Sequence, residues 1–490
     1  MPADSTPSRT SLASLAVLAV ATLASGVLFF FSVGLNGIAA LAWLAPVPVL
    51  AVSLAASKRA AGLASFIAYG LGGLSVFSFM LRVAPPLIVV AIVVLPAVFF
   101  ALAVLAARRA AARLDPALAV FAFPAVWTAY EYLSFAGSPH GTAGSLAYTQ
   151  MGFLPLIQIA SLTGITGITF VLMLVPSGLA LAWHFRKDRR RVMRSLAGPL
   201  AVFLLAMAWG GFRLAQPAAG DPVRVGLTAT DATIEKAFAT DKPDAALPVV
   251  RDYARRAVEL ARRGVSVAVL PEKFVGVAPG DEAEIDRILG DAAKEGRITL
   301  VAGLNRIGRS DARNAAVVFP PDGGPPREYD KIHMLPGFED IYRIGAGPLY
   351  LSVGGAPAGI AICKDMDFPA LTRVYGRAGT GILFVPAWDF VRDGHLHSRM
   401  GVLRGVENGF AIVRTAQQGL LTVSDDRGRI LAEAVSPVTG ETFLVADVHP
   451  GTGHTLYSRA GDWFAWVVLA GLALLLYGSA YGKATSGRIE

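Results

Sequence analysis

Long apolar runs, separated by short polar segments, occupy the first 220 residues of the chain. Most of them approach the roughly 20 residues that a helix needs to cross the hydrocarbon core of a bilayer. The pattern predicts membrane spans at residues 12–33, 37–56, 61–81, 87–107, 116–135, 154–183 and 196–212, and a last one at 463–481. The run at 154–183 is long enough to include a re-entrant or interfacial portion before Ser161. We therefore expect a transmembrane domain of about seven helices over residues 1–220, and a junction with a C-terminal transmembrane helix over 451–490.

Residues 221–450 have a different pattern, typical of an α/β domain. Short β-branched runs indicate buried strands, and the first two, at 223–227 and 265–270, each precede an amphipathic helical pattern. The first of these helices, at 249–263, ends at Gly264. Later strands are expected in hairpin-like succession, at 298–302, 315–319, 359–362, 382–385, 410–414, 421–424 and 442–448. This order predicts a mixed-sheet α/β sandwich in one domain of about 230 residues.

Composition supports this division into a membrane part and a globular part. The chain is 54% hydrophobic and only 16% charged, whereas soluble proteins carry about 25% charged residues. The net charge of +8 comes from basic residues that cluster between apolar runs, which favours membrane topology over nucleic-acid binding. The single cysteine excludes an internal disulfide and a multi-cysteine metal site.

The cations between the spans predict the orientation of the chain. With seven spans, the three basic loops lie on one side, which the positive-inside rule makes cytoplasmic. These loops contain Lys58 with Arg59, the arginines at 108–113, and the cations at 186–194. The domain at 221–450 then lies outside, and the last span returns Lys483 and Arg488 to the cytoplasm. We interpret residues 1–9 and the apolar run after them as the start of a retained first helix, because no cysteine follows Gly26 and further spans come at once.

Glu131 is an acidic residue within the span expected at 116–135. An acid inside a membrane span marks a functional or packing-critical site. Glu131 also stands beside Tyr130 and Tyr132, which is typical of a structural position near the outer interface. Both interpretations remain open from the sequence.

Three polar residues follow apolar strand patterns and together could perform acyl chemistry. Cys363 ends the apolar run Ile360-Ala361-Ile362, Glu272 follows Val269-Leu270-Pro271, and Lys331 follows Tyr329-Asp330. Alone, each has an ordinary structural explanation, because free cysteines are usually buried and Glu and Lys usually lie on the surface. Together they form a complete set: a carboxylate accepts the thiol proton, the thiolate attacks an acyl carbonyl, and an ammonium stabilises the oxyanion.

These motifs resemble the nitrilase, or carbon–nitrogen hydrolase, superfamily. The resemblance rests on Leu270-Pro271-Glu272, on Tyr329-Asp330-Lys331 with His333, and on the apolar strand that leads into Cys363. It covers about half of the chain. It implies an α-β-β-α sandwich over 221–450 and the catalytic roles of Glu272, Lys331 and Cys363.

The whole arrangement, with several spans, a nitrilase-like domain and one closing span, resembles the apolipoprotein N-acyltransferases, the membrane branch of that superfamily. Local features carry the same resemblance: the stretch from Lys331 to Glu339, Asn314, the segment 404–415, and the junction 455–463. The resemblance implies Glu339 and Asn314 as supporting residues, a membrane phospholipid as acyl donor, and a thioester on the cysteine. It also implies a lipoprotein N-terminal amine as acceptor. The expected location is the bacterial inner membrane, with the catalytic domain on the periplasmic side and no cofactor.

The sequence also departs from that family. Lys364-Asp365 follow the cysteine where the family usually has Tyr-Glu, so Asp365 is expected to support the cysteine with a shorter reach. Leu270 stands where the family has an aromatic residue before Pro-Glu. Pro336-Gly337-Phe338 has Gly before Phe, the inverse of the family's usual Phe-Gly order. These departures keep a second hypothesis open, a membrane-tethered amidase in which water attacks the thioester. A third is a scaffold with a degenerate nitrilase domain.

Two further groups of residues are candidates for parts of the site. Trp388 and Asp389 follow the strand at 382–385 and are expected to line the acyl pocket. His333, His395 and His397 raise the question of a metal, but no carboxylate cluster completes a ligand set in the sequence, so no metal is expected.

Overall fold

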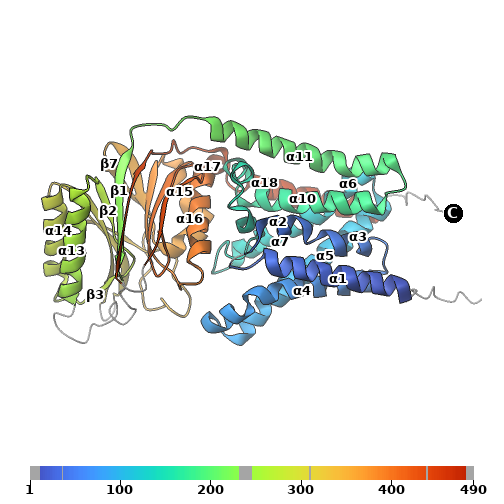
Figure 1. Ribbon diagram of the computed structural model, residues 1–490, viewed down its shortest axis with the longest axis horizontal. Helices are drawn as coiled ribbons and strands as arrows, with labels where there is room; N and C mark the ends of the chain where they lie inside the picture. The colour runs from blue at the N-terminus through green and yellow to red at the C-terminus, as the bar shows by residue number, and fades with distance from the viewer. Residues whose placement is uncertain (1–11, 36, 231–245, 308–310, 437–439, 482–490) are drawn as a thin grey trace, which may run out of the picture.

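The computed structural model describes residues 12–35, 37–230, 246–307, 311–436 and 440–481. It consists of a helical bundle and an α/β domain, connected by one long helix and by the C-terminal segment (Figure 1). The expectations for the N-terminal residues 1–9 and for the tail cations Lys483 and Arg488 lie outside these described residues.

The bundle contains long helices and several short ones. They are α1 (Leu12–Ser32), α2 (Ala39–Leu44), α3 (Val47–Ser53), α4 (Lys58–Val83), α5 (Pro86–Arg113), α6 (Pro116–Ala119), α7 (Ala122–Gly137), η1 (Leu146–Gln150), α8 (Leu154–Ile157), α9 (Ala160–Thr163), α10 (Ile165–His184), α11 (Arg189–Ala215) and α18 (Trp463–Tyr481). Among the described residues, six helices are long and apolar enough to cross a membrane: α1, α4, α5, α10, α11 and α18. The sequence pattern predicted unbroken spans at 37–56 and 116–135, and the structure differs at both.

Prolines explain both breaks. Pro46 and Pro48 lack the amide hydrogens that would continue a helix, and they separate α2 from α3. Pro124, in the first turn of α7, cannot donate to the carbonyl of Val120. That carbonyl instead accepts a hydrogen bond of 2.7 Å from the hydroxyl of Ser177 in α10. A neighbouring helix thus satisfies a backbone group that the proline leaves without a partner, which is how membrane helices tolerate proline.

Small residues and aromatic rings hold the long helices together. Gly72 in α4 lies against Phe29 in α1 so closely that a Cβ atom there would be 2.5 Å from the Phe29 Cβ. The Phe29 ring packs edge-on to Tyr69 and to Phe100, with centroids 4.9 and 5.2 Å away. Trp127 of α7 adds a third ring against Tyr69. Without a hydrophobic driving force between helices in lipid, such close van der Waals packing supplies most of their association.

The three basic loops meet at one end of the bundle. Arg108, near the end of α5, donates a hydrogen bond of 2.8 Å to the carbonyl of Ala56 in the loop before α4. Arg194, in the first turns of α11, forms an ion pair with Asp115, which caps α6. This end of the bundle is the one away from the α/β domain (Figure 1).

Two sheets form the centre of the α/β domain. The seven-stranded sheet has the order β13-β1-β2-β4-β5-β6, with β3 paired to β4, and the six-stranded sheet has the order β12-β11-β10-β9-β8-β7. The strands of the first sheet are β1 (Val223–Thr230), β2 (Val267–Val269), β3 (Val275–Val277), β4 (Thr299–Arg306), β5 (Arg313–Phe319), β6 (Arg327–Asp330) and β13 (Glu441–Val448). Those of the second are β7 (Leu349–Val353), β8 (Ala356–Ile360), β9 (Ile382–Trp388), β10 (Ala411–Gln417), β11 (Leu420–Ser424) and β12 (Ile430–Val435).

Helices cover the outer face of each sheet, so the domain has four layers. Helices α13 (Ala246–Arg262) and α14 (Glu282–Gly296) cover the first sheet, and α15 (Pro369–Arg377) and α16 (Gly394–Asn408) cover the second (Figure 1). Apolar side chains of β1, β2, β8 and β9, such as Val225, Val267 and Phe384, fill the space between the sheets. The predicted α-β-β-α sandwich beside a multi-pass helical domain is confirmed.

The second helical layer also attaches the domain to the bundle. Apolar residues of α16, including Leu403 and Val406, pack with Leu156 and Ile157 of α8. Two polar contacts reinforce this interface, because Arg404 donates to the Tyr148 hydroxyl over 3.2 Å and Glu407 Oε1 accepts from the first amide of α10, at Ile165, over 2.9 Å. On the C-terminal side, α17 (Leu456–Ala460) packs against α15, and Arg373 pairs with Asp462 at 2.7 Å.

Glu131 of α7 is buried and joins neighbouring segments of the bundle through hydrogen bonds. Its carboxylate is buried and accepts four hydrogen bonds, from Trp127 Nε1 (3.2 Å), Ser145 Oγ (2.8 Å), the amide of Leu146 (2.9 Å) and Thr169 Oγ1 (2.7 Å). It therefore ties the segment before η1 to α7 and α10.

Replacing Glu131 should destabilise the bundle. In Glu131→Ala these four donors lose their acceptor inside the protein, and each buried unsatisfied donor costs about 1–3 kcal/mol. We expect a clearly lower thermal unfolding midpoint in detergent. Leu133→Ala, at a position of the same helix that is 58% exposed, is the matched control and should unfold close to the wild-type temperature. Equal midpoints for Glu131→Ala and the wild type would contradict the anchoring role.

Candidate active site

Glu272 leaves the end of β2 through a tight turn. Gly303 of β4 passes so close that a Cβ atom there would be 2.2 Å from the carbonyl oxygen of Pro271. Lys273 adopts a positive φ of 48°, a conformation that is costly for a non-glycine residue and is common at functional sites. The turn leaves the Glu272 side chain buried, with only 1% of its surface exposed.

Lys331 and Asn314 hold one oxygen of Glu272. Lys331, which follows β6, donates to Glu272 Oε1 over 2.8 Å, and Asn314 Nδ2 of β5 donates to the same oxygen over 2.6 Å. The other oxygen, Oε2, has no hydrogen-bond partner among the residues that the structure describes. It is therefore the atom of this carboxylate that is available to accept a proton.

Glu339 completes a buried cluster of two acids and two lysines. It accepts from Lys331 over 2.7 Å, from Lys273 over 2.5 Å and from Asn314 over 2.9 Å. Burial acts to raise the pKa of Glu339, but Lys331 and Lys273 lower that pKa to about 2. Burial acts to lower the pKa of Lys331, and the charges of Glu272 and Glu339 raise it well above its usual value. Lys331 is therefore a fixed ammonium ion at the site.

Cys363 is the first residue of η2 (Cys363–Asp367), which follows β8 through a tight turn. Its φ of 42° lies in the left-handed region, and its sulfur donates to the Trp388 carbonyl over 3.4 Å. The pKa of the thiol is raised overall, because burial and the charge of Glu272 raise it more than a hydrogen bond with His397 and the charge of Lys331 lower it. The sulfur thus lies within electrostatic reach of both Glu272 and Lys331, from strands of the opposite sheet.

Asp365 holds the turn that presents the cysteine. Its carboxylate accepts from the amide of Ile362 (3.0 Å), the amide of His333 (2.9 Å) and the Tyr329 hydroxyl (2.8 Å). These contacts join η2 to the segment that carries Lys331. Asp365 therefore fixes the cysteine relative to the lysine through the backbone.

A cavity of about 1310 Å³ connects this cluster to the membrane helices. Glu272, Lys331, Glu339 and Cys363 lie in one part of its wall. Apolar side chains of α4 and α5 form another part, including Val76, Phe79, Met80, Ile88, Ile92 and Leu95. One continuous space therefore joins the apolar side chains among the helices to Cys363.

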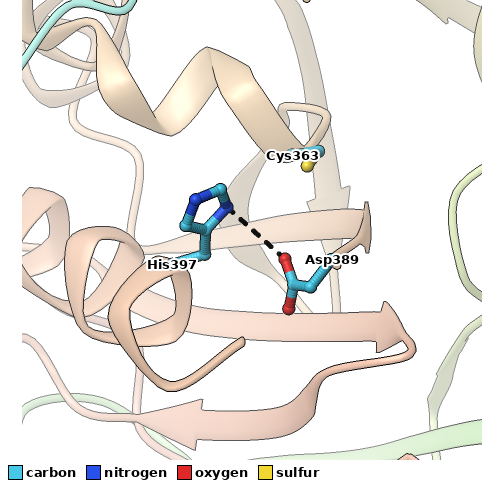
Figure 2. Close-up of side chains that lie close together, drawn as sticks. All are labelled: Cys363, Asp389 and His397. Carbon is cyan, nitrogen blue, oxygen red and sulfur yellow. Dashed lines mark ion pairs between the residues drawn. The ribbon is translucent and has the colours of Figure 1, made fainter. Parts of the chain in front are cut away.

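Trp388 and Asp389 take different places. Trp388 lines the cavity, whereas Asp389 is fully buried and accepts two hydrogen bonds from Arg414, of 3.0 and 2.6 Å. The expectation that Asp389 lines the pocket is therefore not met. Its carboxylate instead faces His397, with 3.5 Å between Oδ1 and Nδ1 (Figure 2).

The residues near Cys363 fit a metal ion poorly. Ligand atoms of Cys363, Asp389 and His397 all lie within 4.8 Å of one another, a distance that alone would admit a metal. Both oxygens of Asp389 are already bound to Arg414. His333 lies elsewhere, stacked on Phe368 and next to Asp365.

Sequence reasoning did not find two parts of the site. Lys273 directly follows Glu272, and its contact with Glu339, 66 positions later, could not be read from the pattern. From the sequence, His397 is considered only as a possible metal ligand. Its position four residues after Asp393, at a helix start, is the signal that a carboxylate could orient its side chain.

Family comparisons match both parts of the chain. A model of the apolipoprotein N-acyltransferase N-terminal domain matches residues 25–178, and one of carbon–nitrogen hydrolase matches residues 239–454. The chain also resembles solved nitrilase-superfamily structures. An amidase from Nesterenkonia sp. shares 21% identity, covers 51% of this chain and 97% of its own, and gives a TM-score of 0.41. A carbon–nitrogen hydrolase from Helicobacter pylori G27 shares 16% identity with this chain. The match covers 54% of this chain and 99% of the hydrolase, with a TM-score of 0.39.

Curated relatives match the chain across the two domains together. The apolipoprotein N-acyltransferase of Geobacter metallireducens is 30% identical over 390 residues, which is 73% of this chain and 73% of the relative. That of Gloeobacter violaceus is 27% identical over 394 residues, 74% and 72% of the two chains. Taken with the sandwich and its helical bundle, these matches show that the chain belongs to the apolipoprotein N-acyltransferase family and is an acyltransferase of the nitrilase superfamily.

Proposed function

We propose that this acyltransferase moves a fatty acyl chain from a membrane phospholipid, through a thioester on Cys363, to the N-terminal amine of a diacylglyceryl-cysteine lipoprotein. The observation that carries the proposal is the single cavity shared by Cys363, Glu272 and Lys331 and by apolar side chains of α4 and α5. Both substrates carry chains too apolar to leave a bilayer. An acyl chain among the helices would place its ester carbonyl at the nucleophile.

The first half-reaction forms the thioester. Glu272 Oε2 takes the proton of the Cys363 thiol, and the sulfur forms a bond to the ester carbonyl carbon. Among the described residues Lys331 donates to two carboxylates, so its third hydrogen is available to the developing oxyanion. When the ester C–O bond breaks, Glu272 returns the proton to the departing lysophospholipid alcohol. A single preorganised oxyanion donor contributes about 2.7–4 kcal/mol to such a step.

The second half-reaction transfers the chain. The neutral amine of the acceptor attacks the thioester carbonyl, Lys331 again faces the oxyanion, and Glu272 accepts a proton from the nitrogen. The C–S bond then breaks, Glu272 returns the proton to the Cys363 sulfur, and the amide leaves. Glu339 and Asn314 support both steps, because they hold Lys331 and Glu272 in place through hydrogen bonds.

The basic loops support one orientation of the protein in the membrane. Arg108, near the end of α5, and Arg194, in the first turns of α11, contact the segments before α4 and α6. The end of the bundle where α6 lies is the one away from the α/β domain (Figure 1). Basic loops favour the cytoplasmic side. This supports a bacterial inner-membrane enzyme whose α/β domain lies on the periplasmic side.

Water is the alternative acceptor, and the resulting activity would be that of a membrane-tethered amidase. Lys364, next to the nucleophile, lines the cavity, pairs with Asp367 at 3.3 Å and contacts His140 at 3.2 Å. These charged groups favour a polar molecule beside Cys363. The apolar helical wall has no role for a small water-soluble amide, and it favours the transferase.

The thioester should be visible by mass spectrometry. Purified protein incubated with phospholipid is expected to gain the mass of one acyl chain, which neutral hydroxylamine removes. Because the chain contains a single cysteine, Cys363→Ala should show no such gain while keeping its unfolding temperature. Acylated Cys363→Ala protein would refute the assignment of the nucleophile.

The acceptor can be identified with a matched pair of lipopeptides. Given phospholipid and a diacylated lipopeptide with a free N-terminus, the enzyme is expected to produce the triacylated lipopeptide. The same lipopeptide with an acetylated N-terminus should remain unchanged, because its nitrogen is no longer nucleophilic. If free fatty acid is the only product in both cases, water is the acceptor and the transferase proposal fails.

A further inference from the structure

A second group of charged side chains lies against the Cys363 sulfur, and the steps above make no use of it. His397, in the first turn of α16, has Nδ1 at 3.5 Å from Asp389 Oδ1 and Nε2 at 3.6 Å from Asp393 Oδ2. The side chains of Cys363, Asp389 and His397 converge from three separate segments (Figure 2). Both ring nitrogens of His397 therefore face carboxylates.

Asp389 is held rigidly in this group. Both of its oxygens accept hydrogen bonds from the buried guanidinium of Arg414 in β10. Gly419 passes so close that a Cβ atom there would be 1.9 Å from Asp389 Oδ2. The carboxylate thus has one position, and in that position it faces His397.

We propose that His397, oriented by Asp389 and Asp393, is a further catalytic residue that keeps a positive charge beside the Cys363 sulfur and stabilises its thiolate. The inference rests on the proposed acyl transfer for its place in the reaction. The pairing of a His397 imidazolium with the Cys363 thiolate, however, can be tested in the free enzyme.

The surroundings of the ring favour the protonated form. Burial acts to lower the pKa of His397, but hydrogen bonds with Asp389 and Cys363 and the charge of Asp393 raise that pKa well above its usual value. The cation Arg414 also lies in this group, and its guanidinium is bound to both oxygens of Asp389. The charges of Glu272 and Lys331 act on the same thiol in opposite directions. An adjacent imidazolium lowers the pKa of a cysteine thiol strongly, because its charge favours the thiolate over the neutral thiol.

A His397 imidazolium beside the Cys363 thiolate is compatible with both half-reactions of the proposed acyl transfer, and every proton can be accounted for. Glu272 takes the thiol proton at the start of the cycle and returns a proton to the sulfur at the end, and His397 keeps both ring protons throughout. In the first step the thiolate forms the C–S bond, the ester C–O bond breaks, and Glu272 protonates the alcohol. In the second step the amine forms the C–N bond and gives a proton to Glu272, and the C–S bond breaks. The sulfur leaves as a thiolate beside the imidazolium, which makes it a better leaving group.

Thiol alkylation tests the proposal without any substrate. With one cysteine in the chain, iodoacetamide incorporation into the full-length protein in detergent reports Cys363 alone. We expect His397→Gln to raise the midpoint of the rate-against-pH curve by at least about 1 pH unit, and to slow alkylation at pH 7 about tenfold. His395→Gln is the matched control on the same helix, since that ring faces Arg399 and Glu433, and its curve should coincide with the wild type.

Two further measurements separate chemistry from packing. Added imidazole should restore alkylation of His397→Ala by occupying the vacated space, which a purely structural role would not allow. Asp393→Asn leaves the ring in place and should shift the midpoint in the same direction by a smaller amount, so it decides the question if His397 variants do not fold. If the alkylation rates of His397→Gln and Asp393→Asn both depend on pH as the wild-type rate does, the proposal is overturned. A wild-type protein with the expected thiol curve but no acylation by phospholipid would instead reject the proposed donor.

Discussion

The rest of the site depends on four clustered charges, the buried Glu272, Lys331 and Glu339 and the partly buried Lys273. Removing such groups from water is expensive, and their mutual attraction offsets that cost only when the geometry is good and the remaining polar atoms are bonded. Lys331 meets this requirement by bridging the two carboxylates at 2.8 and 2.7 Å, and Asn314 contacts both carboxylates. The cluster balances two negative charges against two positive ones, and it is held by turns at the ends of β2 and β6 and by β5 itself.

The cluster acts on Cys363 because the two sheets of the sandwich face each other. Glu272 and Lys331 come from the first sheet, and Cys363 follows β8 of the second. Asp365 links the two by binding both the cysteine turn and the segment around His333. The second sheet also carries α16, which packs on α8 and places the open side of the site against the helices that line the cavity. The sandwich thus forms the end wall of a cavity whose other walls include apolar side chains of the helices.

The regular parts of this architecture could be predicted from the sequence. Apolar runs marked the long helices, and β-branched runs followed by Glu272, Lys331 and Cys363 indicated strands whose ends carry polar side chains. The breaks at Pro46 and Pro124 were harder to predict, because hydropathy averages over a window and does not register a missing amide hydrogen.

Contacts between distant segments could not be predicted at all. Lys273 reaches Glu339, and Arg414 binds Asp389, through side-chain directions that depend on the packed sheets. A carboxylate after a strand is equally compatible with a cavity wall and with a buried ion pair. The sequence alone therefore could not show that Asp389 pairs with Arg414 and does not line the pocket. The functional meaning of His397 likewise appears only when α16 lies beside the cysteine turn.

The most direct test of this account is the single-turnover rate of Cys363 acylation by phospholipid in Lys331→Met, compared with Lys331→Arg and the wild type. Methionine keeps much of the volume of lysine but removes the ammonium, and arginine keeps a charge in a different geometry. If the Lys331 ammonium stabilises the oxyanion, folded Lys331→Met should be slower by at least about 100-fold. Lys331→Arg should keep the stability of the wild type and still be impaired. A folded Lys331→Met protein that forms the thioester at nearly the wild-type rate would contradict that role of Lys331.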